Sequence, residues 1–98
     1  MEKVRREQLR WIVLLALYHA RPYGTYEEVL VSTAQALYPD ATTLEMRRVL
    51  DYLEGRELVE VRKEPAGRWW ANLKGRGTDI VEYTIHCEPG IARPEKYW

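Results

Sequence analysis

The sequence contains no phenylalanine, only one cysteine and no excess of charge of either sign. A single cysteine, Cys87, excludes an internal disulfide framework and fits a reducing compartment. The 15 Lys and Arg residues are balanced by 15 Asp and Glu residues. Since a DNA-binding protein usually carries a basic footprint, DNA binding here would require segregated charge. The run from Trp11 to Tyr18 is too short to cross a membrane, so we expect a cytoplasmic protein.

Ninety-eight residues with 46% hydrophobic content predict one domain with a single modest core. The first helix is predicted over residues 3–20, which contain no Gly or Pro and place Leu9, Ile12, Val13 and Ala16 at helical spacing. Its other sides are also apolar, because they carry Trp11, Leu14, Leu15, Leu17 and Tyr18. Such a helix must be covered on more than one side. The cover is either the rest of a monomer or a second subunit, and we predict a homodimer through this helix and the C-terminal segment.

Two further helices are predicted from capping signals. Thr25 and Glu28 have the spacing of a capping box, and the second helix should run from about Tyr26 to Tyr38 before Pro39. The side chains expected to face inward are Val29, Leu30, Thr33 and Leu37.

The third helix should begin after Thr42, which forms a second capping-box pair with Glu45, and should stop at Gly55 in the left-handed conformation. Its predicted buried face consists of Met46, Val49, Leu50 and Leu53, and its outward face of Arg47, Arg48, Asp51, Tyr52 and Glu54. The short connection between these helices fits a helix-turn-helix.

A hairpin follows the third helix directly. Strand character occurs at residues 58–61 and 69–73, with a loop at residues 64–68. Alternation places Trp69 and Trp70 on opposite faces, one in the core and one exposed, and the sequence leaves open which is which. After a loop at residues 75–78, a fourth helix is predicted from Asp79 to His86.

The expected fold class is therefore α+β, a winged helix-turn-helix of order α-α-α-β-β-α. The winged-helix domain should span residues 1–87, followed by an irregular, Pro-containing tail at residues 88–98. Ile91, Tyr97 and Trp98 suggest that this tail packs against another surface.

Two short motifs follow the hairpin. Arg76, Gly77 and Asp79 stand in a Lys-Gly-Arg-Gly-Thr-Asp-Ile segment, and residues 89–94 read Pro-Gly-Ile-Ala-Arg-Pro. They resemble the Thr-x-Arg-Gly-x-Asp-Val and Pro-Gly-Val-Lys-Arg-Pro motifs of short winged-helix proteins encoded in Mu-like phages and prophages. Lys74 stands near the usual threonine, and Ile-Ala replaces Val-Lys. The resemblance implies a winged-helix fold and, by analogy, a DNA-binding or repressor-like role, without a known reaction or ligand.

The residues suited to catalysis or metal binding are few. His19, His86 and Cys87 do not form a spaced metal-binding cluster, and neighbours such as His86 and Cys87 point about 100° apart on a helix. The Gly75-Arg76-Gly77 segment lacks the Gly-Lys-Ser/Thr ending of a phosphate loop. We therefore expect no enzymatic activity, catalytic residue, metal or cofactor.

Double-stranded DNA is the predicted partner, and a small transcriptional regulator of phage or prophage type the predicted role. Hydroxyls at the start of the third helix can meet a phosphate, its basic side chains can reach a major groove, and cations of the hairpin can contact flanking backbone. The predicted contact residues are Thr42, Thr43, Arg47, Arg48, Tyr52, Arg62, Lys63 and Arg68. The alternative role for Arg47 and Arg48 is ordinary surface pairing with Glu45, Asp51 or Glu54.

A second hypothesis is a non-enzymatic winged helix that serves in protein–protein interaction or phage assembly. Neutral charge, the all-round apolar first helix and the aromatic Tyr97 and Trp98 favour it. A continuous basic stripe from the third helix to the hairpin would favour DNA, whereas a mixed surface with exposed aromatic residues would favour a protein partner.

Overall fold

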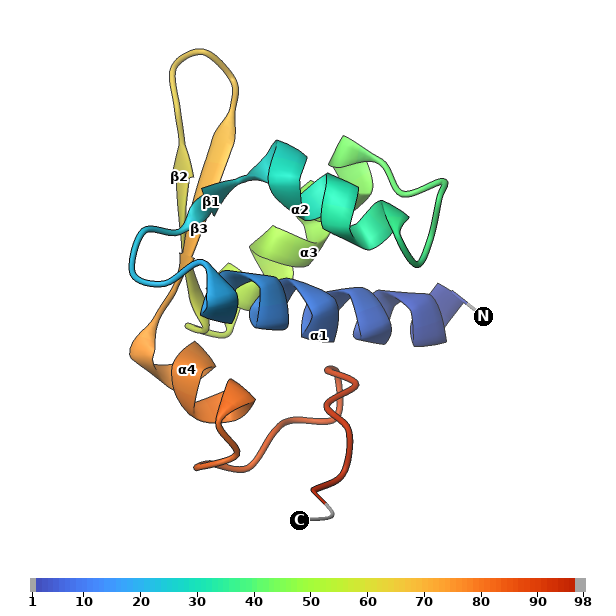
Figure 1. The fold of residues 1–98 in the computed structure, drawn as a ribbon, viewed down its shortest axis with the longest axis vertical. Helices are drawn as coiled ribbons and strands as arrows, with labels where there is room; N and C mark the ends of the chain where they lie inside the picture. The colour runs from blue at the N-terminus through green and yellow to red at the C-terminus, as the bar shows by residue number, and fades with distance from the viewer. Residues whose placement is uncertain (1, 97–98) are drawn as a thin grey trace.

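The computed structural model describes residues 2–96, which form four helices and three strands (Figure 1). In chain order these elements are α1 (Glu2–His19), β1 (Thr25–Tyr26), α2 (Glu27–Gln35), α3 (Thr43–Gly55), β2 (Val59–Lys63), β3 (Trp69–Leu73) and α4 (Gly75–Val81). The β2–β3 hairpin projects beyond the helices as a wing, with α1, α2 and α3 packed beside its base. The predicted α+β winged helix-turn-helix is confirmed.

The sheet has a third strand that the sequence did not predict. Its antiparallel order is β1-β3-β2, with Thr25 opposite Ala71 and Tyr26 opposite Trp70. Gly24 makes this pairing possible, because it adopts φ +71° and a Cβ atom there would overlap the backbone carbonyl oxygen of Ala71. Since Thr25 lies in the strand, the predicted Thr25–Glu28 capping box is wrong, and Tyr26 precedes α2 without a side-chain cap.

Helix α2 is shorter than predicted and is rotated relative to the predicted inward face. It ends at Gln35 rather than near Tyr38, and its buried side chains are Glu27, Leu30 and Ala34. Of the side chains expected to face inward, only Leu30 is buried, while Val29, Thr33 and Leu37 are exposed. The rotation places an acidic residue, Glu27, on the core side of the helix.

Helix α3 follows the sequence prediction closely. Met46, Val49, Leu50 and Leu53 are all buried, as expected. The Thr42 hydroxyl accepts a hydrogen bond from the Glu45 amide, so this cap is confirmed on the hydroxyl side. Helix α3 ends at Gly55 as predicted, but the predicted left-handed conformation of this glycine is wrong: the positive φ occurs at Glu57 (+64°), and Leu58 donates its amide hydrogen bond to the carbonyl of Leu53.

Helix α1 is covered on more than one side by its own chain. It contacts α2, α3, β3 and α4, and its buried residues lie around much of its circumference: Leu9, Trp11, Val13, Leu14 and Leu17. The C-terminal segment supplies further cover, because the Ala92 amide donates to the Glu7 carbonyl and Ile91 is buried. Intrachain packing therefore accounts for the apolar character that motivated the predicted homodimer, which stays a prediction.

The segment after β3 differs from the prediction. Helix α4 begins at Gly75 and ends at Val81, earlier than the predicted helix from Asp79 to His86. Tyr83 then adopts φ +62°, and its ring packs edge-on against Trp11. Residues 82–86 are not helical, contrary to the prediction, whereas residues 88–96 contain no helix or strand, as expected for the tail; Tyr97 and Trp98 lie outside the described residues. Within residues 2–96, none of the helices is long and apolar enough to cross a membrane.

Candidate nucleic-acid interface

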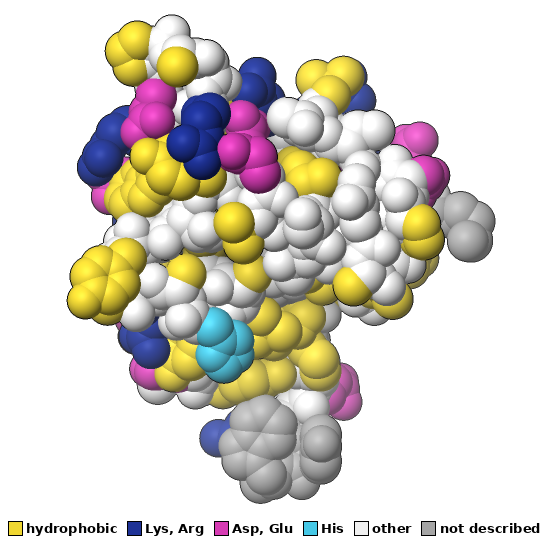
Figure 2. All heavy atoms as spheres, turned by 45° about the horizontal axis from the view of Figure 1, so that its top comes forward, with side chains coloured by type: hydrophobic (Ala, Val, Ile, Leu, Met, Phe, Trp, Pro, Cys, Tyr) yellow, Lys and Arg dark blue, Asp and Glu magenta, His cyan; other side chains and the backbone are white. Residues whose placement is uncertain are grey.

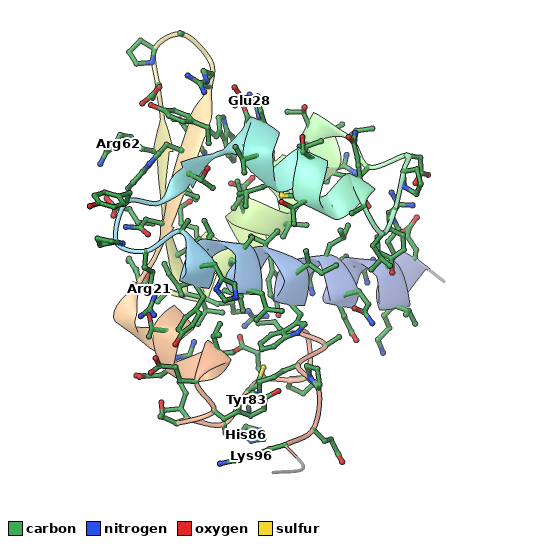
Figure 3. All side chains as sticks on the ribbon, in the orientation of Figure 1. Arg21, Glu28, Arg62, Tyr83, His86 and Lys96 are labelled. Carbon is green, nitrogen blue, oxygen red and sulfur yellow. The ribbon has the colours of Figure 1, made fainter. Side chains whose placement is uncertain are left out.

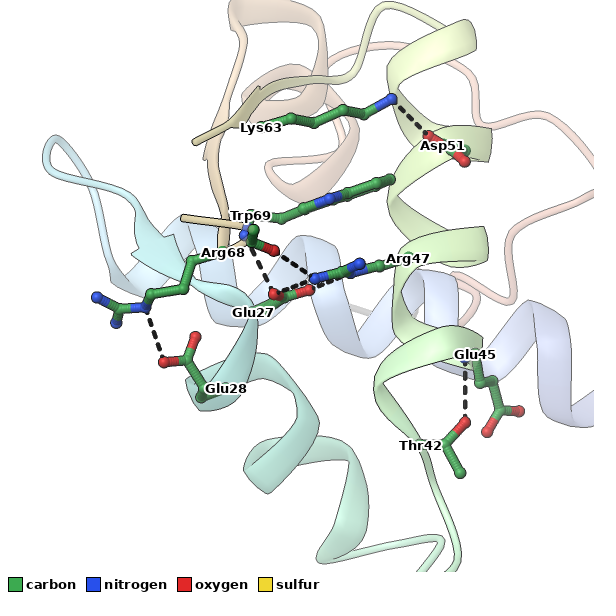
Figure 4. A network of polar contacts seen from close by, with 10 residues as sticks. Glu27, Glu28, Thr42, Glu45, Arg47, Asp51, Lys63, Arg68 and Trp69 are labelled. Atoms are coloured by element: carbon green, nitrogen blue, oxygen red, sulfur yellow. Dashed lines mark hydrogen bonds and ion pairs between the residues drawn. The ribbon is translucent and has the colours of Figure 1, made fainter. Parts of the chain in front are cut away.

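A buried carboxylate connects the helix-turn-helix to the wing. Glu27, only 5% exposed, accepts hydrogen bonds of 2.7 Å from both Nε and Nη2 of Arg47 on α3. It also accepts a 3.1 Å bond from the backbone amide of Trp69 on β3. Arg47 donates a further bond to the carbonyl of Gly67 in the wing loop (Figure 4). We call Glu27, Arg47, Gly67 and Trp69 the wing clamp, because together they join α2, α3 and the wing.

The hydrogen bonds of the wing clamp favour the charged forms of both Glu27 and Arg47. Hydrogen bonds from Arg47 hold the pKa of the Glu27 carboxyl below its usual value, and the Trp69 amide acts in the same direction. The Trp69 ring lies between two cations, 5.0 Å from the Arg47 guanidinium carbon and 4.5 Å from Lys63 Nζ. Arg47 is therefore a structural residue, and the prediction that it points outward is wrong.

The outward face of α3 begins at its N-terminus. Thr42, Thr43, Leu44 and Arg48 are exposed, and Leu44 is 61% exposed. Among residues 2–96, Arg48 has no hydrogen-bond or ion-pair partner. Thr42 uses its hydroxyl to accept from Glu45, while its donor capacity remains available. This face thus presents one unpaired guanidinium and two hydroxyls beside the amide groups at the start of a 13-residue helix.

Two wing cations lie close to acidic side chains. Lys63 Nζ is 3.9 Å from an Asp51 carboxylate oxygen, and each side chain is 56% exposed. Arg68 contacts Glu28 at 2.9 Å and stacks on the Tyr26 ring at 3.7 Å. Exposed ion pairs of this kind contribute little to stability, because water solvates both partners well when they separate. The two cations can therefore exchange their carboxylates for another anion at small cost.

Two predicted contact residues lie away from this surface. Arg62 pairs with Trp70 across the hairpin and stacks on its ring at 4.2 Å, on the opposite sheet face from Lys63 and Trp69. Figure 3 shows Arg62 on the side of the wing away from α3. Tyr52 is half-buried between the guanidinium groups of Arg10 and Arg56, at 3.4 and 4.8 Å.

The two wing tryptophans are both half-buried, so the expectation of one core and one exposed residue is wrong. Trp69 packs against the core under Arg47, and Trp70 is covered by Arg62 and by the close approach of Gly24. Basic side chains, together with the core at Trp69 and with Gly24 at Trp70, cover the two rings, so neither is fully open to solvent.

The surface charge is mixed. Figure 2 shows basic and acidic side chains alternating around the wing end of the molecule, without a continuous basic stripe on the face in view. This pattern follows from the contacts above, because Asp51 and Glu28 accompany Lys63 and Arg68. The eight predicted residues therefore divide into an open group (Thr42, Thr43 and Arg48), an exchangeable group (Lys63 and Arg68) and three that serve other contacts.

Sequence reasoning missed Glu27, the residue that organises the site. Its signal was present, because Glu27 lies three residues before Leu30 and seven before Ala34, on one helical face. An acidic residue on a buried face requires a cationic partner. Of the residues described, no group of three or more His, Cys, Asp or Glu side chains is placed to hold a metal ion.

Taken together, α1–α4 and the β2–β3 wing define a winged-helix domain. A crystal structure from Ralstonia eutropha JMP134, described as that of a "putative DNA-binding protein", is similar to this chain with a TM-score of 0.66. The two are 24% identical, and the similarity covers 80% of this chain and 95% of the other. At this identity the likeness supports the fold. No protein-family model matches the chain, and no curated protein matches it significantly.

Proposed function

We propose that this domain binds double-stranded DNA as a non-enzymatic regulator of phage or prophage type. Helix α3 would enter the major groove, with Thr43 and Arg48 toward the DNA, and Lys63 on the wing would contact adjacent backbone. The wing clamp is the observation that carries the proposal. By joining α3 to the wing loop through Arg47, it holds Arg48 and Lys63 in a fixed relative position before any ligand arrives.

The balanced charge is compatible with this function if the exposed ion pairs are exchangeable. Arg48 needs no rearrangement, and Lys63 can leave Asp51 for a phosphate oxygen. Arg47 behaves differently, because leaving Glu27 would strand a buried carboxylate. Few free cations imply weak nonspecific affinity, since that affinity grows with the number of phosphates neutralised.

The test compares two double variants of equal charge. Arg48→Ala with Lys63→Ala removes two cations from the proposed interface, and Arg21→Ala with Arg62→Ala removes two exposed cations from elsewhere. Binding to labelled duplex DNA is followed by fluorescence anisotropy over a salt series. We expect the first variant to lose affinity and to reduce the slope of log K against log salt by about 2, because each phosphate contact contributes about one counterion.

The control variant should retain the wild-type slope. Equal losses in both double variants would show that net charge alone governs binding and would refute the assigned interface. No binding of the wild-type protein to diverse duplexes at about 50 mM salt would refute the DNA-binding proposal.

A specific observation also supports the second candidate, a protein-interaction module. Leu44 is 61% exposed at the start of α3, and Tyr23 is 81% exposed beside the sheet. An exposed apolar side chain on a reading helix can contact a thymine methyl group or an apolar patch on a protein. Leu44→Ser distinguishes the two through DNA affinity: a protein-interaction role predicts no change in anisotropy.

A further inference from the structure

A hollow of about 410 Å³ lies between the N-terminal halves of α1 and α3. Its volume is in the range of small-molecule sites. Leu9 and Val49, which are 1% and 3% exposed, form apolar parts of its lining, and Leu44 lies at its exposed edge. Leu9 and Val49 are already buried, so the apolar side chain that the hollow offers to a ligand is Leu44, which an organic molecule, but not a bare inorganic ion, would cover.

The polar lining has a surplus of positive charge. It comprises four arginines and three carboxylates. Arg5 neutralises two of these carboxylates at once, because its guanidinium contacts Asp40 at 2.9 Å and Glu45 at 2.8 Å. The third carboxylate, Glu2, lies 3.8 Å from Arg6 in an exposed pair. Arg10 and Arg48 are left without a carboxylate among the described residues.

Both arginines line the hollow. Arg10 stacks at 3.4 Å on the ring of Tyr52, and Tyr52 follows Arg48 by four residues on α3, so the two share one helix face. Arg10 donates from Nη1 to the Gly90 carbonyl, whereas its Nε is buried without an acceptor. Burial lowers the pKa of Arg10, which shows that its charge is poorly solvated. An anion in the hollow would supply the missing countercharge.

We propose that the hollow binds a small organic anion, a carboxylate with an apolar body. The acid group accepts hydrogen bonds from Arg10 and Arg48, and the apolar body packs against the exposed Leu44. Because Arg48 also belongs to the proposed DNA interface, a bound anion would neutralise a DNA-contacting cation. The effect on DNA binding rests on the proposed function, whereas the anion site itself does not.

The primary experiment is a ¹H–¹⁵N NMR titration of the full chain with three probes. Octanoate carries both charge and an apolar chain, octan-1-ol lacks the charge, and inorganic phosphate lacks the chain. Below the micelle concentration, octanoate should cause saturable shifts at the amides of Leu9 and Val49. We expect octan-1-ol and phosphate each to bind at least about tenfold more weakly than octanoate, because octan-1-ol lacks the charge and phosphate lacks the apolar chain.

A matched pair of variants assigns the charge. Arg48→Gln should weaken octanoate binding by about tenfold, since it removes one charge-assisted hydrogen-bond donor. Arg21→Gln, which removes an exposed arginine outside the lining, should leave binding unchanged. Amide spectra of both variants verify that the fold is retained.

Several outcomes would overturn the proposal. These are the absence of saturable shifts, shifts confined to residues outside the hollow, and equal binding of octanoate and octan-1-ol. Phosphate binding as tight as octanoate would also overturn it and would indicate a DNA-backbone phosphate as the natural anion. A separate experiment measures whether octanoate competes with labelled DNA. If octanoate binds but the DNA affinity is unchanged, the anion site stands and only its link to DNA binding is refuted.

Discussion

Replacing Glu27 with glutamine should destabilise the protein far more than the same change at Glu28. Glu27 is buried and accepts three hydrogen bonds, two of them from the Arg47 guanidinium. A glutamine keeps one acceptor oxygen, but its NH₂ group would face the N–H donors of Arg47 and Trp69, and the negative charge is lost. Glu28 is 57% exposed, and within residues 2–96 its carboxylate pairs only with Arg68.

The expected magnitude follows from the contacts. A hydrogen bond to a charged group contributes about 1.5–3 kcal/mol, and the bonds to Glu27 are not additive because they share one carboxylate. Arg47 is one-third exposed, so water recovers part of the loss on its side. We therefore expect Glu27→Gln to lower the free energy of unfolding by about 2–4 kcal/mol. In a domain of this length that corresponds to a fall in Tm of roughly 10–25 °C.

Thermal and urea unfolding followed by circular dichroism provide the measurement. Glu28→Gln, the adjacent control, should change the free energy of unfolding by less than about 1 kcal/mol, as for exposed ion pairs. If the two variants unfold alike, the wing clamp does not stabilise the fold and our account of Arg47 is wrong.

Acidification provides an independent check on the same carboxylate. Because the folded state holds the pKa of Glu27 below its usual value of 4.5, its charge stabilises the fold above about that pH. The contribution is then lost as the pH falls from that value through the lower folded pKa. The stability difference between wild type and Glu27→Gln should therefore be constant near neutrality and should shrink below pH 4.5. A difference independent of pH down to acid unfolding would contradict this assignment.

Two further predictions concern the wing surface and α4. Asp51→Asn frees Lys63 and removes a repulsive charge, so anisotropy should show tighter DNA binding, by a few-fold, with a steeper salt dependence; weaker or unchanged binding would contradict the placement of Lys63 at the interface. Gly77→Ala should destabilise the protein by about 1–3 kcal/mol in urea unfolding, because a Cβ atom there would overlap the Leu58 carbonyl oxygen. Its control, Gly75→Ala, meets nothing within 4 Å and should be neutral or stabilising; a neutral Gly77→Ala would refute the close contact.

Much of the fold could be predicted because its signals are local. The buried face of α3 follows from the spacing of Met46, Val49, Leu50 and Leu53, and its start from the Thr42 hydroxyl. Local signals were misleading where a distant segment intervened. Thr25 has capping chemistry, but pairing with Ala71 draws it into a strand, and the close approach at Gly24 depends on residues 46 to 48 positions away.

The candidate site was only partly accessible from sequence. Periodicity marked Arg47 and Arg48 alike as basic residues outside the buried seam of α3, and nothing local distinguishes them. Their different roles depend on Glu27, which lies on another helix, and on the Gly67 carbonyl in the wing loop. Sequence also gave no indication that Arg5 neutralises two carboxylates near the start of α3.

The sequence by itself determined that three helices precede a hairpin, the buried face of the reading helix and the position of the wing, because these depend on spacing and capping within a few residues. Only the tertiary structure decided which cations are held in structural contacts and which are free to meet a ligand. That distinction depends on desolvation: Glu27 loses its water when α2 packs against α3 and β3, so Arg47 must remain beside it, while Arg48 one residue later stays exposed.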